Sequence, residues 1–211
     1  MIQEGFFPGK GVDILNTSPS ILQHRPTPMP STSHFNIWQK LQQSIKPICK
    51  HLPRSFVPEV GINIGYALPN ATAADEICAL NGRIIKKKES IQQCGQLCYG
   101  GSKHIASIIL AAMNPHPTLR SAMNIRYTKE NLSYCEQTNL TLASFNRADQ
   151  PETIDSTMEW GTTQAMQNHS NIPDLIYDLG SIGKEPMIRI IANDPKHLLE
   201  KLRSIIQKTK Q

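Results

Sequence analysis

A glycine pair that leads into an apolar helix is the feature that most constrains the fold of this chain. Gly100 and Gly101 precede Ser102, and apolar residues then recur at helical spacing through residues 105–112. Ser102 is a natural N-cap residue. Because the first backbone N–H groups of a capped helix are unpaired and its dipole is positive there, this junction predicts a turn that binds an anion.

A β-strand is expected before this helix, over residues 60–66. Bulky apolar side chains alternate there with small or polar ones, and Pro69-Asn70 follows as a stop signal. Gly61 and Gly65 fall on one face of that strand. Two glycines on one face leave room for another group to approach the backbone.

The rest of the chain alternates between strand and helix patterns. Asn81-Gly82 is the strongest turn signal and predicts a hairpin between strands at 77–80 and 83–85. A helix is expected over 35–50, with Trp38 on its apolar side and Pro47 as an interruption. Further helices are expected at 103–113, 128–138, 160–167 and after Asp194-Pro195, and further strands at 122–127, 140–145, 174–177 and 187–191. This alternation predicts an α/β fold, a layered domain with a mixed β-sheet flanked by helices.

Composition separates the first 34 residues from the rest. They contain prolines at positions 8, 19, 26, 28 and 30 and many Ser and Thr residues. Residues 1–34 are therefore expected to be a flexible linker or tail. Residues 35–211 are long enough for one domain.

Charge, hydropathy and cysteine usage narrow the class of partner. The net charge of +5 suits anionic partners, and Lys86-Lys87-Lys88 favours a solvated turn over a nucleic-acid surface. No stretch approaches the roughly 20 apolar residues of a membrane span, and the N-terminus lacks a basic-then-apolar signal pattern. A cytoplasmic protein without a nucleic-acid or membrane partner is expected.

The five cysteines include no Cys-x-x-Cys pair and predict free, mostly buried thiols.

Several polar residues stand where the predicted sheet could meet an anionic ligand. Arg83 offers a planar fork that fits phosphate oxygens. Asn124 and Arg126 share one face of a strand, which lines either a pocket or a solvent-facing surface. Arg147 follows a strand end, where α/β sheets collect their ligands. The candidate substrate- or phosphate-binding residues are Asn63, Gly101, Ser102, Lys103, Asn124, Arg126, Arg147, Asp178 and Lys184.

Seven blocks of sequence occur in one order between residues 56 and 207. They are PEVGINIGYALP at 58–69, GRI at 82–84, GGSKH at 100–104, RSAMNIRY at 120–127, SFNR at 144–147, WG at 160–161, and PDLIYD at 173–178 with GKEP at 183–186. Together, in this order and at this spacing, they resemble the archaeal-type thiamine-phosphate synthase domain, the ThiN family. Several blocks in register are a far more specific signal than any one of them.

The resemblance implies a transferase with two substrates. It would join hydroxymethylpyrimidine diphosphate to hydroxyethylthiazole phosphate and release thiamine phosphate and diphosphate. In this family an arginine and a histidine act in catalysis, and Arg83 and His104 stand at their positions. A regulatory branch of the family binds thiamine phosphate, lacks this pair and carries a DNA-binding domain. That non-catalytic sensor is the alternative, although residues 1–55 contain no helix-turn-helix pattern.

The resemblance also bears on the cofactor and the partners. Mg²⁺ is the expected cofactor, with Asp178 and Glu185 as candidate ligands, although relatives often carry an acid where this chain has Asn146 and Ser181. The domain often follows a hydroxymethylpyrimidine kinase in one longer chain. Residues 1–34 are accordingly expected to be a remnant of such a fusion, and a pyrimidine kinase is an expected partner. A homodimer is expected as well.

Overall fold

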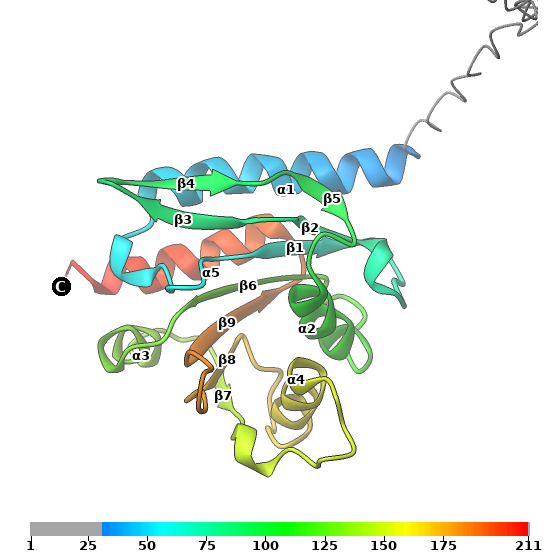
Figure 1. Ribbon diagram of the computed structural model, residues 1–211, viewed down its shortest axis with the longest axis vertical. Coiled ribbons are helices and arrows are strands. Elements are labelled where there is room, and N and C mark those ends of the chain that lie inside the picture. The colour runs from blue at the N-terminus through cyan, green and yellow to red at the C-terminus, as the bar shows by residue number, and fades with distance from the viewer. Residues whose placement is uncertain (1–30, 211) are drawn as a thin grey trace, which may run out of the picture.

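The structure, a computed structural model, describes residues 31–210 (Figure 1). Its main sheet is mixed, because one edge pair, β7 and β8, runs parallel and every other neighbouring pair is antiparallel. A separate two-stranded sheet pairs β3 (Arg83–Lys87) with β4 (Ser90–Cys94). The main sheet consists, in spatial order, of β5 (Leu97–Tyr99), β2 (Ile77–Leu80), β1 (Ile64–Ala67), β6 (Ser121–Arg126), β9 (Met187–Ala192), β8 (Leu175–Asp178) and β7 (Leu142–Ser144).

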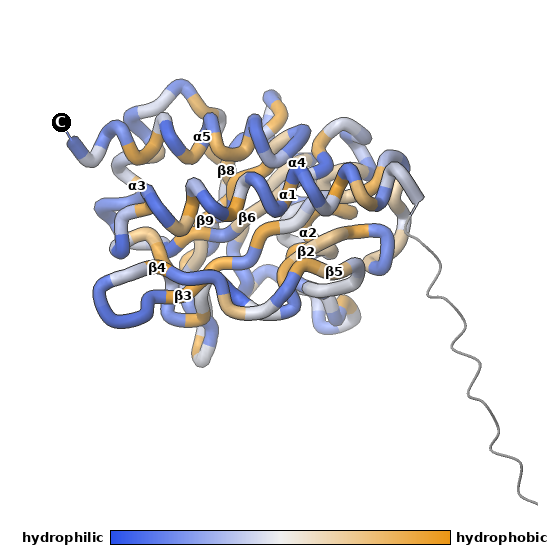
Figure 2. Tube along the Cα trace, turned by 90° about the horizontal axis from the view of Figure 1, so that it is seen from above, coloured by the Kyte–Doolittle hydropathy of each residue, from blue (hydrophilic) through white to orange (hydrophobic). Residues whose placement is uncertain are grey.

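Helices cover both faces of the main sheet, so the predicted layered α/β fold is confirmed (Figure 1). The first face carries α1 (Thr32–His51) and α5 (Pro195–Lys208), and α3 (Lys129–Glu136) packs beside α5. The second face carries α2 (Lys103–Met113) and α4 (Thr157–Gln167). In Figure 2, hydrophobic and hydrophilic residues alternate along α1 and α5, as expected for helices that turn one side to a core.

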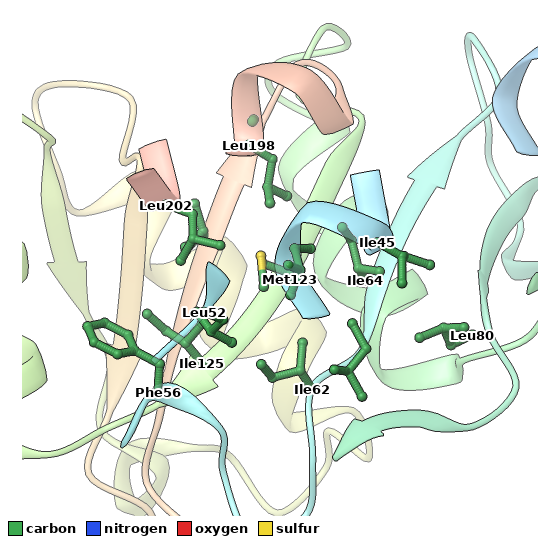
Figure 3. Packing of buried hydrophobic residues seen from close by; sticks show 14 of the residues in the cluster. Ile45, Leu52, Phe56, Ile62, Ile64, Leu80, Met123, Ile125, Leu198 and Leu202 are labelled. Atoms are coloured by element: carbon green, nitrogen blue, oxygen red, sulfur yellow. The ribbon is translucent and has the colours of Figure 1, made fainter. Parts of the chain in front are cut away.

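Each face of the sheet has its own hydrophobic core. Figure 3 shows part of the first core, in which Ile45 of α1 and Leu198 of α5 lie over Ile64 and Met123 of the sheet. The second core joins α2 and α4 to small side chains of the sheet, among them Ala122. Small residues on this face let the helices approach the strands closely.

Gly65 on β1 is one of these close approaches. A Cβ atom at Gly65 would lie 2.5 Å from Cγ2 of Ile105, so the group that approaches the backbone here is α2. The strand expected over 60–66 is shifted to 64–67. Gly61 has a φ of +77° and Val60 is 58% exposed, because the chain turns at these residues before it enters the sheet.

The predicted hairpin around Asn81-Gly82 is wrong. Strand β2 pairs with β1 and β5, whereas β3 turns back through Lys88 to pair with β4. Asn81 accepts a hydrogen bond from the backbone N–H of Gln96 at 2.8 Å, and a Cβ at Gly82 would lie 2.1 Å from the Cys94 carbonyl oxygen. The Asn-Gly pair therefore marks a close crossing of two chain segments, which its turn propensity alone does not distinguish from a hairpin.

Helix α1 differs from its prediction at the start and in its exposed side. It begins at Thr32 with Ser31 as N-cap and continues through Pro47 to His51. Trp38 is 38% exposed and stacks on Phe35, whereas Ile37 is buried. The phase of the helix explains this, because Ile37 lies on the buried face with Leu41, and Trp38, about 100° further round the helix than Ile37, lies at the edge of that face. Residues 1–30, most of the predicted tail, lie outside the described residues.

The remaining predicted elements agree with the structure to within about three residues. The five cysteines are free, as expected, but only Cys78 and Cys135 are fully buried, and Cys94 is exposed. Lys86 and Lys87 belong to β3 and only Lys88 occupies the turn that was expected for all three. Within residues 31–210 no helix has the length and apolar character needed to cross a membrane.

Candidate active site

A cavity of about 320 Å³ opens on the face of the sheet that carries α2 and α4. On this face Ala122 of β6 pairs with Ile191 of β9 beneath the helices. The next pair on the same face, Asn124 with Arg189, lines the cavity. The apolar core thus ends one residue pair before the cavity begins, and polar side chains form the cavity floor.

The cavity brings together most of the residues proposed from the sequence. They come from segments far apart in the chain, including the start of β3, the first turn of α2 and the loop before β9. Those that line it are Asn63, Arg83, Ser102, His104, Asn124, Arg147, Lys184 and Glu185. Gly101, Lys103, Arg126 and Asp178 lie outside its lining.

Arg83 and His104 reach the cavity from different elements. The backbone of Ile84 exchanges two hydrogen bonds with Ile62, at 2.8 and 2.9 Å, which holds the start of β3 beside the segment that precedes β1. His104 lies in the first turn of α2, where its side chain is partly accessible to solvent. Ser102 caps this helix, as predicted, by accepting from the Ile105 N–H at 3.4 Å.

The environment of His104 is strongly positive. Partial burial lowers the pKa of His104, and nearby positive charges lower it further. Those charges are Arg189, Arg147, Arg83 and Lys184, in decreasing order of effect. The neutral imidazole is therefore favoured near pH 7, and an anion that offsets these cations would favour the protonated form.

The buried carboxylate of Asp178 holds two arginines at the cavity. Arg147 donates from Nε to Oδ1 at 2.5 Å and from Nη2 to Oδ2 at 3.3 Å, and Arg189 donates from Nη2 to Oδ2 at 2.6 Å. The N–H of Gly180 adds a bond to Oδ1 at 2.8 Å. Although burial acts to raise the pKa of Asp178, the bonds to Arg147 and the charge of Arg189 hold it below its ordinary value.

These contacts leave Asp178 little capacity to act as the metal ligand that it was expected to be. Four donors occupy a carboxylate that has about four acceptor positions, and none of it lines the cavity. Arg189 was not among the predicted residues. Its signal in the sequence is an arginine inside an otherwise apolar strand, Met187–Ala192, where a charged side chain needs a specific partner.

Asn63 and Asn124 use their amides within the protein. Asn63 donates to the carbonyl oxygens of Leu80, at 2.8 Å, and Gly82, at 3.1 Å, and accepts from the N–H groups of Ile64 and Leu80. Asn124 accepts from the Asn63 N–H at 2.8 Å and donates to the Gly61 carbonyl oxygen at 3.1 Å. Both side chains therefore shape the cavity wall by fixing the segment 61–63.

Gly101, Lys103 and Arg126 lie outside the cavity lining, each for a different structural reason. A Cβ at Gly101 would lie 2.4 Å from the Ala79 carbonyl oxygen, so glycine is required there for packing against β2. Lys103 is exposed beside His104, and successive helical residues point about 100° apart. Arg126 lies 3.9 Å from the exposed carboxylate of Glu59.

The loop before β9 adds a cation and a carboxylate to the cavity. Lys184 is exposed in a turn closed by two backbone bonds with Ser181. The Glu185 carboxylate accepts from the N–H groups of Glu59 and Val60 at 3.1 to 3.3 Å, which fastens the loop to the segment before β1. No cluster of three or more His, Cys, Asp or Glu residues suited to a metal ion occurs in the described part of the chain.

One wall of the cavity is apolar. Ile105 and Ile108 of α2, Met158 of α4 and Met187 of β9 contribute to it. The cavity thus combines cationic and apolar side chains, which suits a ligand that has both anionic groups and an apolar ring. The fold and the site define a layered α/β domain with a cavity that is cationic in part and apolar in part. The family model of thiamine-phosphate synthase ThiN matches residues 40–204, and the chain belongs to this family.

Two curated relatives agree with this family. The bifunctional thiamine biosynthesis protein ThiDN of Methanocaldococcus jannaschii is 39% identical over 162 residues, which are 76% of this chain and 38% of that protein. The thiamine-phosphate synthase ThiN of Methanothermobacter thermautotrophicus is 34% identical over 159 residues, 74% of this chain and 84% of that protein. The chain therefore spans well under half of the bifunctional relative and most of the second one.

Solved structures share the fold. A C-terminal domain of a phosphomethylpyrimidine kinase superposes with a TM-score of 0.78 at 31% identity, over 82% of this chain and 99% of that domain. An aldolase II superfamily protein from Pseudomonas syringae superposes with a TM-score of 0.51 at 8% identity, over 84% of this chain and 75% of that protein. At that identity the likeness concerns the fold alone.

Proposed function

We propose that this chain is a transferase that condenses hydroxymethylpyrimidine diphosphate with hydroxyethylthiazole phosphate to thiamine phosphate and diphosphate. The observation that carries the proposal is the meeting of Arg83 and His104 with Arg147 and Lys184 at one cavity, in a chain of the ThiN family. Both substrates are polyanions, and the cavity offers the cations Arg83, Arg147, Lys184 and Arg189.

The reaction requires a bond between the pyrimidine methylene carbon and a diphosphate oxygen to break. The electron pair leaves with the diphosphate, and the lone pair of the thiazole nitrogen then forms the new C–N bond. Arg83, Arg147 and Lys184 would stabilise the charge that develops on the departing diphosphate. His104 would donate a proton to it or hold the phosphate of the thiazole substrate. The apolar wall would keep water from the reacting carbon.

Mg²⁺ remains a proposal as the cofactor. Glu185 is the carboxylate that lines the cavity, and its oxygens already accept three backbone bonds. Magnesium sites in enzymes of phosphorylated substrates combine one or two carboxylates with substrate oxygens. An ion here would therefore be held by Glu185 together with the diphosphate, and it would supply further neutralisation of charge.

The partners and setting of the reaction are proposals too. The bifunctional relative motivates a pyrimidine kinase as the partner that delivers the diphosphate substrate. Free thiols at all five cysteines are consistent with a reducing, cytoplasmic setting. A homodimer is expected, and light scattering after size-exclusion chromatography measures it directly.

One assay tests the proposed function. Purified protein is incubated with both substrates, with Mg²⁺ or with EDTA, and thiamine phosphate and diphosphate are quantified by mass spectrometry. We expect equal amounts of the two products. Tight binding of thiamine phosphate without turnover in either condition would instead identify the chain as a ligand sensor.

A further inference from the structure

Arg189 is a buried cation whose hydrogen-bonding capacity the protein uses incompletely. Its side chain is 3% exposed, yet it lines the cavity. It donates to Asp178 and, at 3.4 Å, to the Met187 carbonyl oxygen. An arginine has five N–H donors, so most of those of Arg189 have no protein partner among residues 31–210. No nitrogen of Arg189 is among the buried atoms without a partner in the described chain, so its remaining donors face the cavity, where a ligand can accept them.

The charge balance around Arg189 also indicates an anionic partner that the protein does not supply. Among residues 31–210, Asp178 is the one carboxylate that acts on Arg189, and Arg147 shares that carboxylate. Two positive groups and one negative group leave a net positive charge in a place largely withdrawn from water. A cluster built only for stability would be neutral or apolar, because buried charge without compensation destabilises a fold.

The surroundings of Arg189 fix the plane of its guanidinium group. The Phe145 ring lies 5.4 Å below Cζ, and Asp178 holds one edge. Gly161 lets this ring lie close to α4, since a Cβ there would come within 2.3 Å of Phe145. A planar fork held in this way presents its free donors in a fixed geometry, which suits two oxygens of one phosphate group.

We propose that Arg189 binds a phosphate group of the substrate at the cavity floor, and that Asp178 positions Arg189 and Arg147 for this contact. The inference deepens the proposed function, on which it rests, by assigning a phosphate subsite to a residue outside the Arg83 and His104 pair. Arg189 contacts the substrate, whereas Asp178 acts only by holding the two guanidinium groups.

Calorimetric titration with inorganic pyrophosphate tests this subsite without any turnover. The parent chain is compared with Arg189→Met, Arg189→Lys and the control Arg203→Met, which removes an exposed arginine of α5. We expect the control to bind as the parent does and Arg189→Met to bind roughly 10- to 100-fold more weakly, the usual effect of losing charge-assisted bonds. Arg189→Lys should fall between them, because lysine keeps the charge but lacks the fork.

The melting temperature of each variant, with and without pyrophosphate, separates binding from folding. A folded Arg189→Met variant that binds pyrophosphate with the affinity of the parent would overturn the inference, as would a parent that binds none. If Arg189→Met does not fold, Arg189→Lys decides, and parent-like affinity in that variant would again overturn it. Binding that depends on Arg189 in a chain that makes no thiamine phosphate would leave this subsite intact and reject the proposed reaction.

Discussion

Asn63 and Arg83 donate hydrogen bonds to the same oxygen atom, the carbonyl of Gly82. The Asn63 amide reaches it at 3.1 Å and the Arg83 guanidinium at 2.7 Å. Asn63 lies at the entrance to β1 and Arg83 at the start of β3, so this shared acceptor joins the main sheet to the small sheet. We conclude that Asn63 contributes to the site by positioning the strand that carries Arg83.

Replacement of Asn63 by Ala is expected to lower both stability and activity. Three buried backbone groups, the Ile64 N–H and the N–H and carbonyl of Leu80, would lose their side-chain partner, at about 1–3 kcal/mol for each group left unsatisfied. The Gly82 carbonyl would keep only its bond from Arg83. Chemical denaturation should show a loss of several kcal/mol, and the folded fraction should turn over more slowly. The matched control is Asn139→Ala at an exposed position. A variant that unfolds at the parent's denaturant midpoint would contradict this role.

Replacement of Arg83 by Ala is expected to reduce turnover far more than stability. Its described hydrogen bond is local, to the adjacent Gly82, so few tertiary contacts are lost. Arg83→Lys should recover activity only in part, since an ammonium group binds phosphate as a point charge. Steady-state kinetics beside a melting curve make the comparison. Activity that falls only in proportion to the folded fraction would show that Arg83 is structural.

Replacement of His104 by Ala distinguishes two ways of acting. If His104 donates a proton to the leaving diphosphate, kcat should fall by roughly 10²–10⁴-fold. If it only holds a phosphate group, KM should rise more than kcat falls. Lys103→Ala, which removes the exposed neighbour, is the comparison variant. Parent-like kinetics in a folded His104→Ala variant would remove His104 from the site.

The pKa of His104 is expected to rise when pyrophosphate binds. Partial burial and four nearby cations hold it below the ordinary value of 6.5, and a bound polyanion would offset those cations. Proton NMR titration, with His104→Gln to assign the signal, measures the pKa in both states. An unchanged pKa at saturating pyrophosphate would place the anion away from His104.

The lowered pKa of His104 in the folded state predicts how the stability of the protein depends on pH. The folded state binds a proton at His104 less readily than the unfolded chain does. The contribution of neutral His104 to the free energy of unfolding is therefore fully present above pH 6.5. That contribution is lost as the pH falls through the lower folded-state pKa. Denaturation of the parent and His104→Gln across pH 5–8 should show a smaller loss on acidification for the variant, and parallel curves would refute it.

Deletion of residues 1–30 is expected to leave the melting temperature and turnover nearly unchanged. The reason is their content of Pro, Ser and Thr, which disfavours a packed core. Deletion of residues 1–34 should behave differently. It removes Ser31, the N-cap of α1, at about 1 kcal/mol, and His34, whose carbonyl accepts from the Tyr99 hydroxyl at 2.9 Å. Insolubility of the shorter deletion would show that residues 1–30 are needed by the domain.

Local sequence determined the features that depend on near neighbours along the chain. Ser102 and Asp194 cap the helices that they were expected to begin, because an N-cap bonds a backbone N–H only two or three residues away. The apolar periodicity of α2 and α5 was likewise visible in the sequence, whereas the strands β4 and β5 were not predicted. The blocks that contain Arg83 and His104 were also recognisable from the sequence.

Tertiary structure decided the features that depend on distant partners. Asn81-Gly82 has the signal of a hairpin, but β2 pairs with β1 and β5, which leaves β3 to pair with the adjacent β4. Asp178 was a candidate metal ligand because it follows a strand. The fold places Arg147 and Arg189, from other segments, within ion-pair distance of its carboxylate. These ion pairs and the pairings of β2 join separate segments of the chain, so their energies depend on the assembled fold and not on local propensity.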